Sequence, residues 1–468
     1  MTTRRRGGQI TLDDVLLFGS AMPRPRELMD PELRRVDEIL DDDQVVDQVF
    51  TVLRRRWPNS ARKGRASTPA EIVLRLLVLK HLRRWSYEQM QWEVTGNLVY
   101  RHFCRIELGK VPDAKTMVRY GKLLDEEALR PIFDRLVQRA VEKRVTRGRR
   151  MRVDTTVVEA PIHYPTDSDL CADVTRVVGR ELERIEEAGG KLPFRRADVR
   201  RSVGRRLREI AQGLRRRGEA AKEAVKRPYR RLLRVTARMV RQAERAAASL
   251  RRRLPRMKAE RRRTVERSIA RLERVLPQAR QVVRQTRARI LRGVPNSDGK
   301  IISIFEPYAR IMRRGKLHRP TEFGVLVKVQ EADGGIVTDI AVVPTTHDSQ
   351  LLVPSVKRHV EVFGRAPHLT ATDRGFFSVD GERRIIELGV KRAVIPHCGY
   401  RSKQRVAHER QRWFRRGRAW RAGGEARIAR LKHHFGMARS RYRGERGVGR
   451  TVYWAAIANN LVAIARSA

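Results

Sequence analysis

One strand-like segment constrains the fold of this chain more than any other feature. Residues Met151–Glu159 (MRVDTTVVE) are rich in β-branched side chains, which favour a pleated and partly buried strand. Further segments of strand character follow only after a long interruption: Glu322–Glu331, Ile336–Pro344, His368–Asp373 and Val390–Pro396. The first strand must therefore find its partners far along the chain.

Helical patterns alternate with the later strands. Asp348 or Ser349 is expected to cap a helix that runs to Phe363. Two more helices are predicted at Asp380–Leu388 and near Arg421–Phe435. The order of three strands, helix, strand, helix, strand and helix predicts an α/β or α+β arrangement in which a meander feeds a parallel portion.

The N-terminal part of the chain is predicted to be helical. Residues 1–66 are mixed and hold short helical stretches at Pro31–Leu40 and Asp43–Leu53, whereas residues 67–145 carry strong helix signals. The start and stop signals there are Thr68-Pro69, a capping-box pattern of Ser86 with Gln89, a cap at Asp113 and a helix from Asp125 to Lys143. Several short helices with a basic surface resemble a helix-turn-helix DNA-binding module, and the alternative is an ordinary helical bundle.

The interruption between the strands, residues 170–297, is predicted to be a basic helical insertion. Within residues 195–292, 35 Lys plus Arg stand against eight Asp plus Glu, so more than half of the net charge lies in about a fifth of the length. Pro228, Pro255 and Pro277 would divide it into two or three long helices. At this charge density we expect contact with the DNA backbone, and the alternative is a solvated helical face.

The charge of the whole chain indicates a polyanionic partner. Its 468 residues carry a formal net charge of +51, with 104 Lys plus Arg against 53 Asp plus Glu. Nucleic acid is the first candidate because Lys and Arg contacts to phosphates drive binding through counterion release. Arg outnumbers Lys, which suits forked phosphate recognition but is equally expected from a GC-rich genome.

Cysteine usage and hydropathy limit the class of protein further. The three cysteines (Cys104, Cys171 and Cys398) are far apart and form no CxxC pair, which argues against a disulfide framework or a zinc site and fits a reducing compartment. No apolar run of membrane-spanning length occurs, and no apolar segment follows the basic N-terminus. We therefore expect a cytoplasmic protein without a membrane partner.

Three acidic residues stand where a sheet could bring carboxylates together. Asp154 interrupts an apolar strand, where a charge is costly without a partner. Asp373 ends the HLTATD strand just before a Gly turn, and Glu425 follows Gly423-Gly424 early in the expected last helix. If the two strands are neighbours, both aspartates approach one point, which a divalent cation makes tolerable.

Oxygen-only ligands of this kind suit Mg²⁺ or Mn²⁺. Two such ions about 4 Å apart can activate a water molecule or a 3′-hydroxyl and stabilise the leaving oxygen of a phosphoryl displacement. The candidate metal-binding and catalytic set is therefore Asp154, Asp373 and Glu425, with two ions expected and no Ser or Cys nucleophile needed.

Several sequence blocks resemble one known family. VDTTVVEAPIHYPTDSDL around Asp154, SIFEPYARIMRRGKLHRPTEFG, TDRGFFS around Asp373 and the stretch from Arg410 to Arg466 are similar to the DDE transposases of bacterial insertion sequences. The block from Ser67 to Arg119 resembles the helical domain that precedes their catalytic cores. The resemblance implies a ribonuclease H-like mixed sheet flanked by helices, in a bacterial protein associated with the nucleoid.

The third block of that family resembles Y-x2-R-x3-E-x6-K. Arg421, Glu425 and Lys432 match its spacing, while Arg418 stands at the Tyr position and Trp420 is the nearest aromatic residue. The resemblance implies that Asp154, Asp373 and Glu425 are the metal ligands and that Arg421 and Lys432 contact a phosphate near the cut. Further DNA contacts are expected from Arg374, Lys316, Arg251, Arg252, Arg253, Arg261, Arg262 and Arg263.

The predicted organisation is therefore an N-terminal segment (1–66), a helical DNA-binding domain (67–145), a catalytic core (146–169 and 298–468) and the insertion (170–297). Asp167, Asp169 and Asp348 are interpreted as helix caps, and Glu306 as a residue with a structural bond.

The expected function is cleavage of double-stranded DNA at the terminal inverted repeats of a mobile element and strand transfer into target DNA, by a homodimer or larger assembly. The alternatives are a nuclease or recombinase of the same fold, or a catalytically silent DNA-binding relative.

Overall fold

The computed structural model describes residues 24–56, 68–106, 109–216, 218–295, 298–313, 321–343 and 347–467. Among the described residues the chain forms two compact units. The first takes its residues from Met1–Val158, Leu326–Tyr442 and Arg446–Ala468, and the second from Glu159–Val325 and Arg443–Glu445. No helix in the described ranges is long and apolar enough to cross a membrane.

Seven helices are described at the start of the first unit: α2 (Pro31–Leu40), α3 (Asp43–Arg56), α4 (Ala70–Arg83), α5 (Tyr87–Gly96), α6 (Leu98–Phe103), α7 (Ala114–Leu123) and α8 (Glu126–Glu142). The predicted caps Ser86 and Asp113 are confirmed, since each accepts a hydrogen bond from the backbone three residues on. Asp125, predicted as the first residue of its helix, caps α8 in the same way. The short helix α6 was not predicted.

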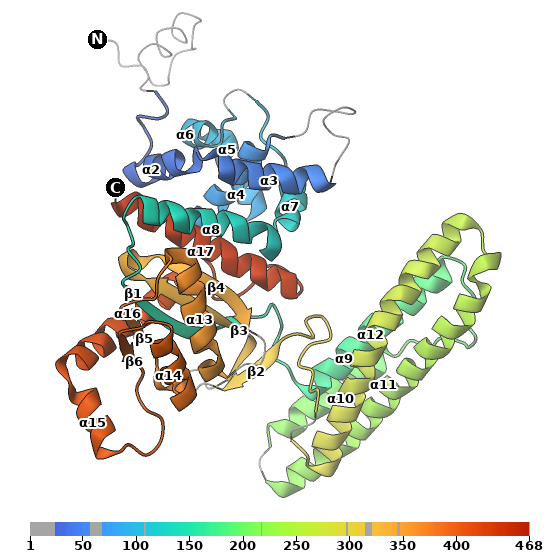
Figure 1. The fold of residues 1–468 in the computed structure, drawn as a ribbon. Coiled ribbons are helices and arrows are strands. Elements are labelled where there is room, and N and C mark those ends of the chain that lie inside the picture. Colours follow the sequence, from blue (N-terminus) through green and yellow to red (C-terminus); the bar gives the residue numbers. More distant parts are fainter. Residues whose placement is uncertain are drawn as a thin grey trace, which may run out of the picture. The chain divides into compact units, whose positions relative to one another are not determined.

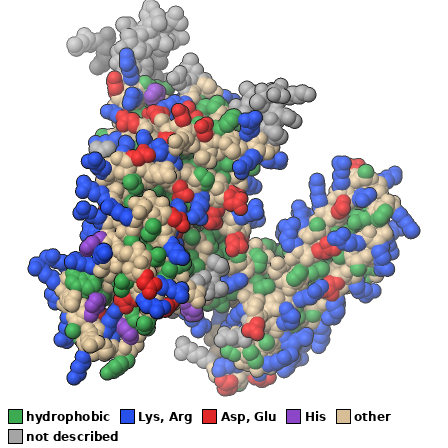
Figure 2. All heavy atoms as spheres, viewed as in Figure 1, with side chains coloured by type: hydrophobic (Ala, Val, Ile, Leu, Met, Phe, Trp, Pro, Cys, Tyr) green, Lys and Arg blue, Asp and Glu red, His purple; other side chains and the backbone are tan. Residues whose placement is uncertain are grey.

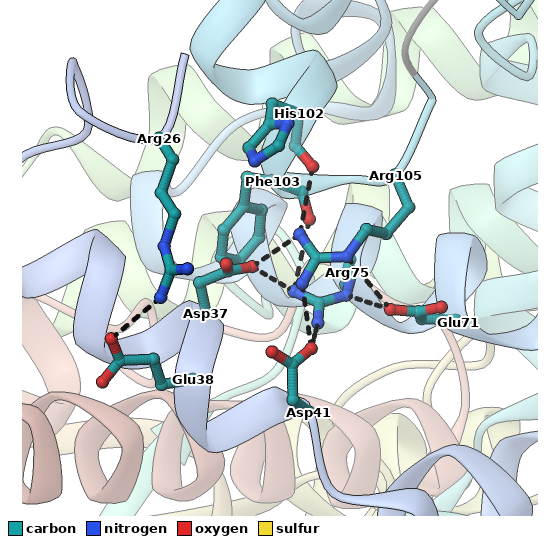
Figure 3. Close-up of polar contacts among 9 residues, drawn as sticks. All are labelled: Arg26, Asp37, Glu38, Asp41, Glu71, Arg75, His102, Phe103 and Arg105. Carbon is teal, nitrogen blue, oxygen red and sulfur yellow. Dashed lines mark hydrogen bonds and ion pairs between the residues drawn. The ribbon is translucent and has the colours of Figure 1, made fainter. Parts of the chain in front are cut away.

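A buried arginine ties α2, α4 and α6 together (Figure 3). Arg75 is fully buried in α4, and its guanidinium pairs with Asp37 at 2.5 Å, with Glu71 at 2.8 Å and with Asp41. Arg105 contacts the same three carboxylates. A buried charge in this position is compensated on every side, as burial requires.

The C-terminal helix α17 (Glu445–Ser467) runs through the middle of the first unit, alongside α8 and between the N-terminal helices and the sheet (Figure 1). It is buried around its whole circumference, which is expected only of a helix surrounded by other elements. Asn460 exchanges two hydrogen bonds with the backbone of Val337 and so fixes the helix to the sheet.

The sheet has the strands β1 (Arg150–Glu159), β2 (Arg310–Arg313), β3 (Thr321–Ala332), β4 (Val337–Val343), β5 (Leu369–Ala371) and β6 (Arg392–Val394). Its order is β2-β3-β1-β5-β6, with β4 also on β3. β3 is antiparallel to β2 and β4, whereas β5 is parallel to β1 and β6. The five predicted strands and the parallel portion are confirmed, and β2 is additional.

Helices cover both faces of this sheet. Met151 and Val153 of β1 pack with α13 (Asp348–Phe363) and α14 (Val379–Glu387). Leu369 and Ala371 of β5 pack on the other face with Phe414 of α16 (Arg412–His433). The small helix α15 (Lys403–Arg410) precedes α16. Side chains point to opposite faces of the sheet in turn along a strand, so every second residue of β1 and β5 faces α16.

In the described part of the second unit, four α-helices surround a continuous apolar core: α9 (Asp167–Glu187), α10 (Arg200–Leu214), α11 (Glu219–Arg253) and α12 (Ala259–Arg292). Figure 2 shows Lys and Arg side chains crowded over its surface. The prediction that Pro228 and Pro277 end helices is wrong, because both lie inside helices. Pro255 does mark a break, in the turn between α11 and α12.

Candidate active site

Asp154 lies on the face of β1 that α16 covers. Its side chain is 19% exposed, and its Oδ2 accepts a hydrogen bond from Nη2 of Arg421 at 3.2 Å. Its Oδ1 accepts from the backbone of Thr155 at 2.8 Å. The carboxylate therefore sits at the contact between the sheet and α16, as the strand pattern requires.

Asp373 follows the neighbouring parallel strand at the same level. The β1–β5 register pairs Arg152 with Ala371, and each aspartate lies two residues beyond that pair. Because neighbouring strands lie about 4.8 Å apart, continuation of this register places Asp154 and Asp373 side by side. Oδ1 of Asp373 also accepts from the backbone of Gly375 at 2.9 Å, which fixes the turn after the strand.

Glu425 reaches the site through Arg421. Nη1 of Arg421 lies 3.4 Å from Oε1 of Glu425, so one guanidinium contacts both Glu425 and Asp154. The Glu425 side chain is 71% exposed. The prediction that Glu425 stands early in its helix is wrong: α16 begins at Arg412, and Glu425 lies past its middle.

Asp348 is a further carboxylate at this edge, and its interpretation as a helix cap is wrong. His347 holds the cap position of α13, and Asp348 instead accepts a hydrogen bond from Oγ1 of Thr155 at 3.1 Å. A Cβ placed on Gly375 would lie 3.2 Å from both Oδ2 of Asp348 and Oδ1 of Asp373. The two carboxylates therefore flank Gly375, a proximity that no sequence spacing indicated.

The other acidic residues singled out in the sequence have structural partners. The prediction that Asp167 and Asp169 cap a helix is wrong, because Thr166 holds the cap position of α9. Asp169 exchanges hydrogen bonds with Thr166, and Asp167 pairs with Arg289 at 2.7 Å. Glu306 is buried and accepts from the backbone of Gly444 at 2.9 Å, which confirms its structural bond.

The chemistry of the donor set fits a hard divalent cation. Asp154, Asp373 and Glu425 offer only carboxylate oxygens, the ligands that Mg²⁺ and Mn²⁺ prefer. Within the described ranges, however, no three His, Cys, Asp or Glu side chains are grouped closely enough to hold a metal ion. In this structure the Arg421 guanidinium forms ion pairs with two of the three carboxylates, Asp154 and Glu425.

The expected DNA-contacting residues divide into three groups. Arg421 and Lys432 lie on α16, and Arg374 is exposed in the turn after Asp373. Lys316 lies outside the described residues. Six exposed arginines form one end of the helical bundle, where α11 turns into α12: Arg251, Arg252, Arg253, Arg261, Arg262 and Arg263. We call this group the bundle tip.

Comparison with known proteins gives a class for the N-terminal helices. Residues 24–123 match the family model described as "Transposase domain (DUF772)". This match supports a transposase family for the chain.

One curated relative adds little to that assignment. The chain is 28% identical over 127 residues to the "Uncharacterized protein ORF8 in nfe locus" of Rhizobium meliloti, across 26% of this chain and 61% of the relative. The chain thus spans less than two thirds of the relative's length. No solved structure matches the chain.

Proposed function

We propose that this protein is a DDE transposase that cuts DNA at the ends of a mobile element and joins the freed 3′-hydroxyl to target DNA. The arrangement of the three carboxylates carries the proposal. Asp154 of β1 and Asp373, just after the neighbouring parallel strand β5, lie at matching positions, and Arg421 contacts both Asp154 and Glu425. The strand order β4-β3-β1-β5-β6, with α16 against β5 and β6, supports a ribonuclease H-like core.

Asp154, Asp373 and Glu425 would hold Mg²⁺ or Mn²⁺, two ions in the working complex. When bound, such ions stabilise the attacking and leaving oxygens of a phosphodiester displacement. The carboxylates would contribute by holding the ions in place with their negative charge, and no Ser or Cys nucleophile is required.

The chain's own basic groups would position the DNA. Arg374 follows Asp373 directly and is exposed, and Lys432 lies seven residues beyond Glu425 on α16, within about 20° of the same helical direction. Both can hold phosphates beside the carboxylates. The helices of residues 67–145 would bind the terminal repeats, and the bundle tip would bind the backbone of the same duplex through counterion release. A homodimer or larger assembly would process two ends together.

The test uses the purified full chain and labelled duplexes made from the DNA that flanks its reading frame. We expect cleavage and strand transfer in Mg²⁺ or Mn²⁺, and loss of both in Asp154→Asn and Asp373→Asn with duplex affinity retained. Asp380→Asn removes an exposed carboxylate of α14 and is the matched control. Undiminished cleavage by Asp154→Asn would refute the proposal, and cleavage without joining would favour the nuclease alternative.

A further inference from the structure

Beneath α16 lies a buried ion cluster that the carboxylate triad does not include. Glu331 of β3 has a side chain only 4% exposed. It accepts hydrogen bonds from Nε of Arg152 at 2.8 Å and from Nε of Arg427 at 3.1 Å. Arg152 precedes Asp154 by two residues on the same face of β1, and Arg427 follows Glu425 by two residues on α16. One buried carboxylate thus joins the two elements that carry Asp154 and Glu425.

One glycine of α16, Gly423, makes room for this cluster. Glycine inside a helix costs about 1 kcal/mol relative to alanine, so the pair Gly423-Gly424 needs a reason. A Cβ on Gly423 would lie 2.7 Å from Nη1 of Arg152. That same nitrogen donates to the carbonyl of Trp420 at 2.6 Å, and the guanidinium lies 4.8 Å from the Trp420 ring. The Arg152 guanidinium therefore packs against the turn of α16 formed by Trp420 and Gly423, just before Glu425.

Arg427 anchors the same helix to a third element. Its Nη1 donates to Oδ1 of Asn459 in α17 at 2.8 Å, and Asn459 donates to the carbonyl of Gly335 at 3.2 Å. Gly335 has a φ of +75°, and a Cβ there would collide with the Arg427 guanidinium. The Arg427 guanidinium is thus in contact with Glu331 of β3, Asn459 of α17 and the backbone at Gly335.

The cluster fixes the rotation of α16 about its own axis. Trp420, Gly424 and Arg427 form the row that faces the sheet, and Arg421, Glu425 and Lys432 form the next row, about 100° around the helix. Buried ion pairs add little stability compared with apolar packing, but they demand one geometry. A small rotation of α16 would carry Arg421 and Glu425 away from Asp154.

We propose that Arg152 and Arg427, held by Glu331, are positioning residues that set Glu425 against Asp154 for catalysis. This inference rests on the proposed function. It gives a role to Gly423 and Trp420, which the family spacing leaves unexplained.

The sharpest test is Gly423→Ala, measured in the full chain with Mn²⁺ and the flanking-DNA duplex. The new methyl group favours the helix but displaces the end of the Arg152 side chain. We expect the cleavage rate at saturating DNA to fall about tenfold to a hundredfold, because small misplacements of reacting groups have effects of that size. The KM for DNA should stay within about twofold, the Mn²⁺ concentration for half-maximal rate should rise, and thermal stability should not fall.

Glu331→Gln is the second variant, with Ala422→Ser on the exposed side of α16 as control. It should show the same loss of rate with unchanged DNA affinity. Wild-type rates and Mn²⁺ dependence in both Gly423→Ala and Glu331→Gln would overturn the inference while an inactive Asp154→Asn preserved the proposed function. Equal losses of rate, DNA affinity and thermal stability would also overturn it, because they would indicate a structural role alone.

Discussion

Arg421 donates a hydrogen bond from Nη2 to Oδ2 of Asp154 at 3.2 Å, although the two residues are 267 positions apart in the chain. Both side chains are largely shielded from water, with 23% and 19% exposed. The guanidinium charge therefore stands beside the carboxylate to which we assign a divalent cation. Cation binding and the Arg421 contact should compete.

Replacement of Arg421 by Gln is predicted to strengthen metal binding in the absence of DNA. Loss of a neighbouring positive charge should tighten Mn²⁺ binding about tenfold, equivalent to about 1.4 kcal/mol. Electron paramagnetic resonance of free Mn²⁺ measures this directly. Arg418→Gln removes the same charge from an exposed site of α16 and should leave the affinity unchanged. Equal affinities in wild type and Arg421→Gln would show that the guanidinium does not cover the cation site.

A methyl group on Gly375 should disturb the site without unfolding it. It would lie 3.2 Å from the carboxylates of Asp348 and Asp373, closer than most Cβ contacts, so at least one carboxylate must move. We expect Gly375→Ala to reduce the cleavage rate by about tenfold or more, by the same sensitivity to misplacement. Gly96→Ala adds a methyl group that meets nothing within 4 Å and is the control. An unchanged cleavage rate in Gly375→Ala would indicate that the exact positions of the Asp348 and Asp373 carboxylates do not matter for cleavage.

Local signals predicted much of the fold. The β-branched run of β1 and the caps Ser86 and Asp113 act within a few residues, so the sequence alone identifies them. The prediction of a helix end at Pro228 failed because α11 continues through this residue. Burial of the apolar face of α11 against the neighbouring helices outweighs the one backbone hydrogen bond that proline cannot make. The start of α16 was missed for a similar reason, since Phe414 is held by the sheet.

The candidate site was predictable only in part. Asp154 inside β1 and Asp373 just after β5 could be predicted, because neighbouring parallel strands bring residues of matching register side by side. Glu331 and Asp348 depend on contacts between distant segments, with Arg152 and Thr155 respectively, which have no sequence periodicity. Their roles become visible only when the strands and helices are assembled.

The bundle tip should contribute more to DNA binding than an equal charge elsewhere on the same bundle. The triple variant Arg261→Gln, Arg262→Gln, Arg263→Gln is predicted to weaken duplex binding and to flatten the plot of log affinity against log salt, with a change in slope of up to about 3. The control triple variant replaces Arg230, Arg231 and Arg234, which are exposed on α11 away from the tip. Fluorescence anisotropy at several salt concentrations compares them. Identical slopes for the two triple variants would argue that the tip has no special contact.

Arg75 should be essential for the stability of the N-terminal helices. Arg75→Met leaves the buried carboxylate of Asp37 with one fewer cation, and breaking a buried pair costs about 3–5 kcal/mol. Urea unfolding followed by circular dichroism measures the loss. Arg83→Met breaks an exposed pair with Asp30 and should cost at most about 1 kcal/mol. Similar losses in the two variants would mean that the cluster in Figure 3 is not a stabilising core of this unit.

Stability should fall as the pH drops from about 6.5 towards 4, in part because of His359. This residue is fully buried in α13, donates from Nε2 to the carbonyl of Gly148 at 2.9 Å, and burial lowers its pKa to about 4. Between its folded value and the unfolded value of about 6.5, the unfolded chain binds a proton that the folded chain does not. The contribution of His359 to stability, up to about 3 kcal/mol, is therefore complete above about pH 6.5 and is lost as the pH falls.

The variant His359→Gln isolates this effect because a glutamine amide can still donate to the Gly148 carbonyl. Burial also lowers the pKa of His81 well below its usual range, so the wild-type pH dependence has more than one source. The diagnostic quantity is thus the difference between wild type and His359→Gln in unfolding free energy at pH 7.5, 6 and 5. That difference should shrink or reverse as the pH falls, because only the wild type carries the buried imidazole with the lowered pKa. A difference that stays constant for His359→Gln would mean that the pKa of this imidazole is the same in the folded and unfolded chains.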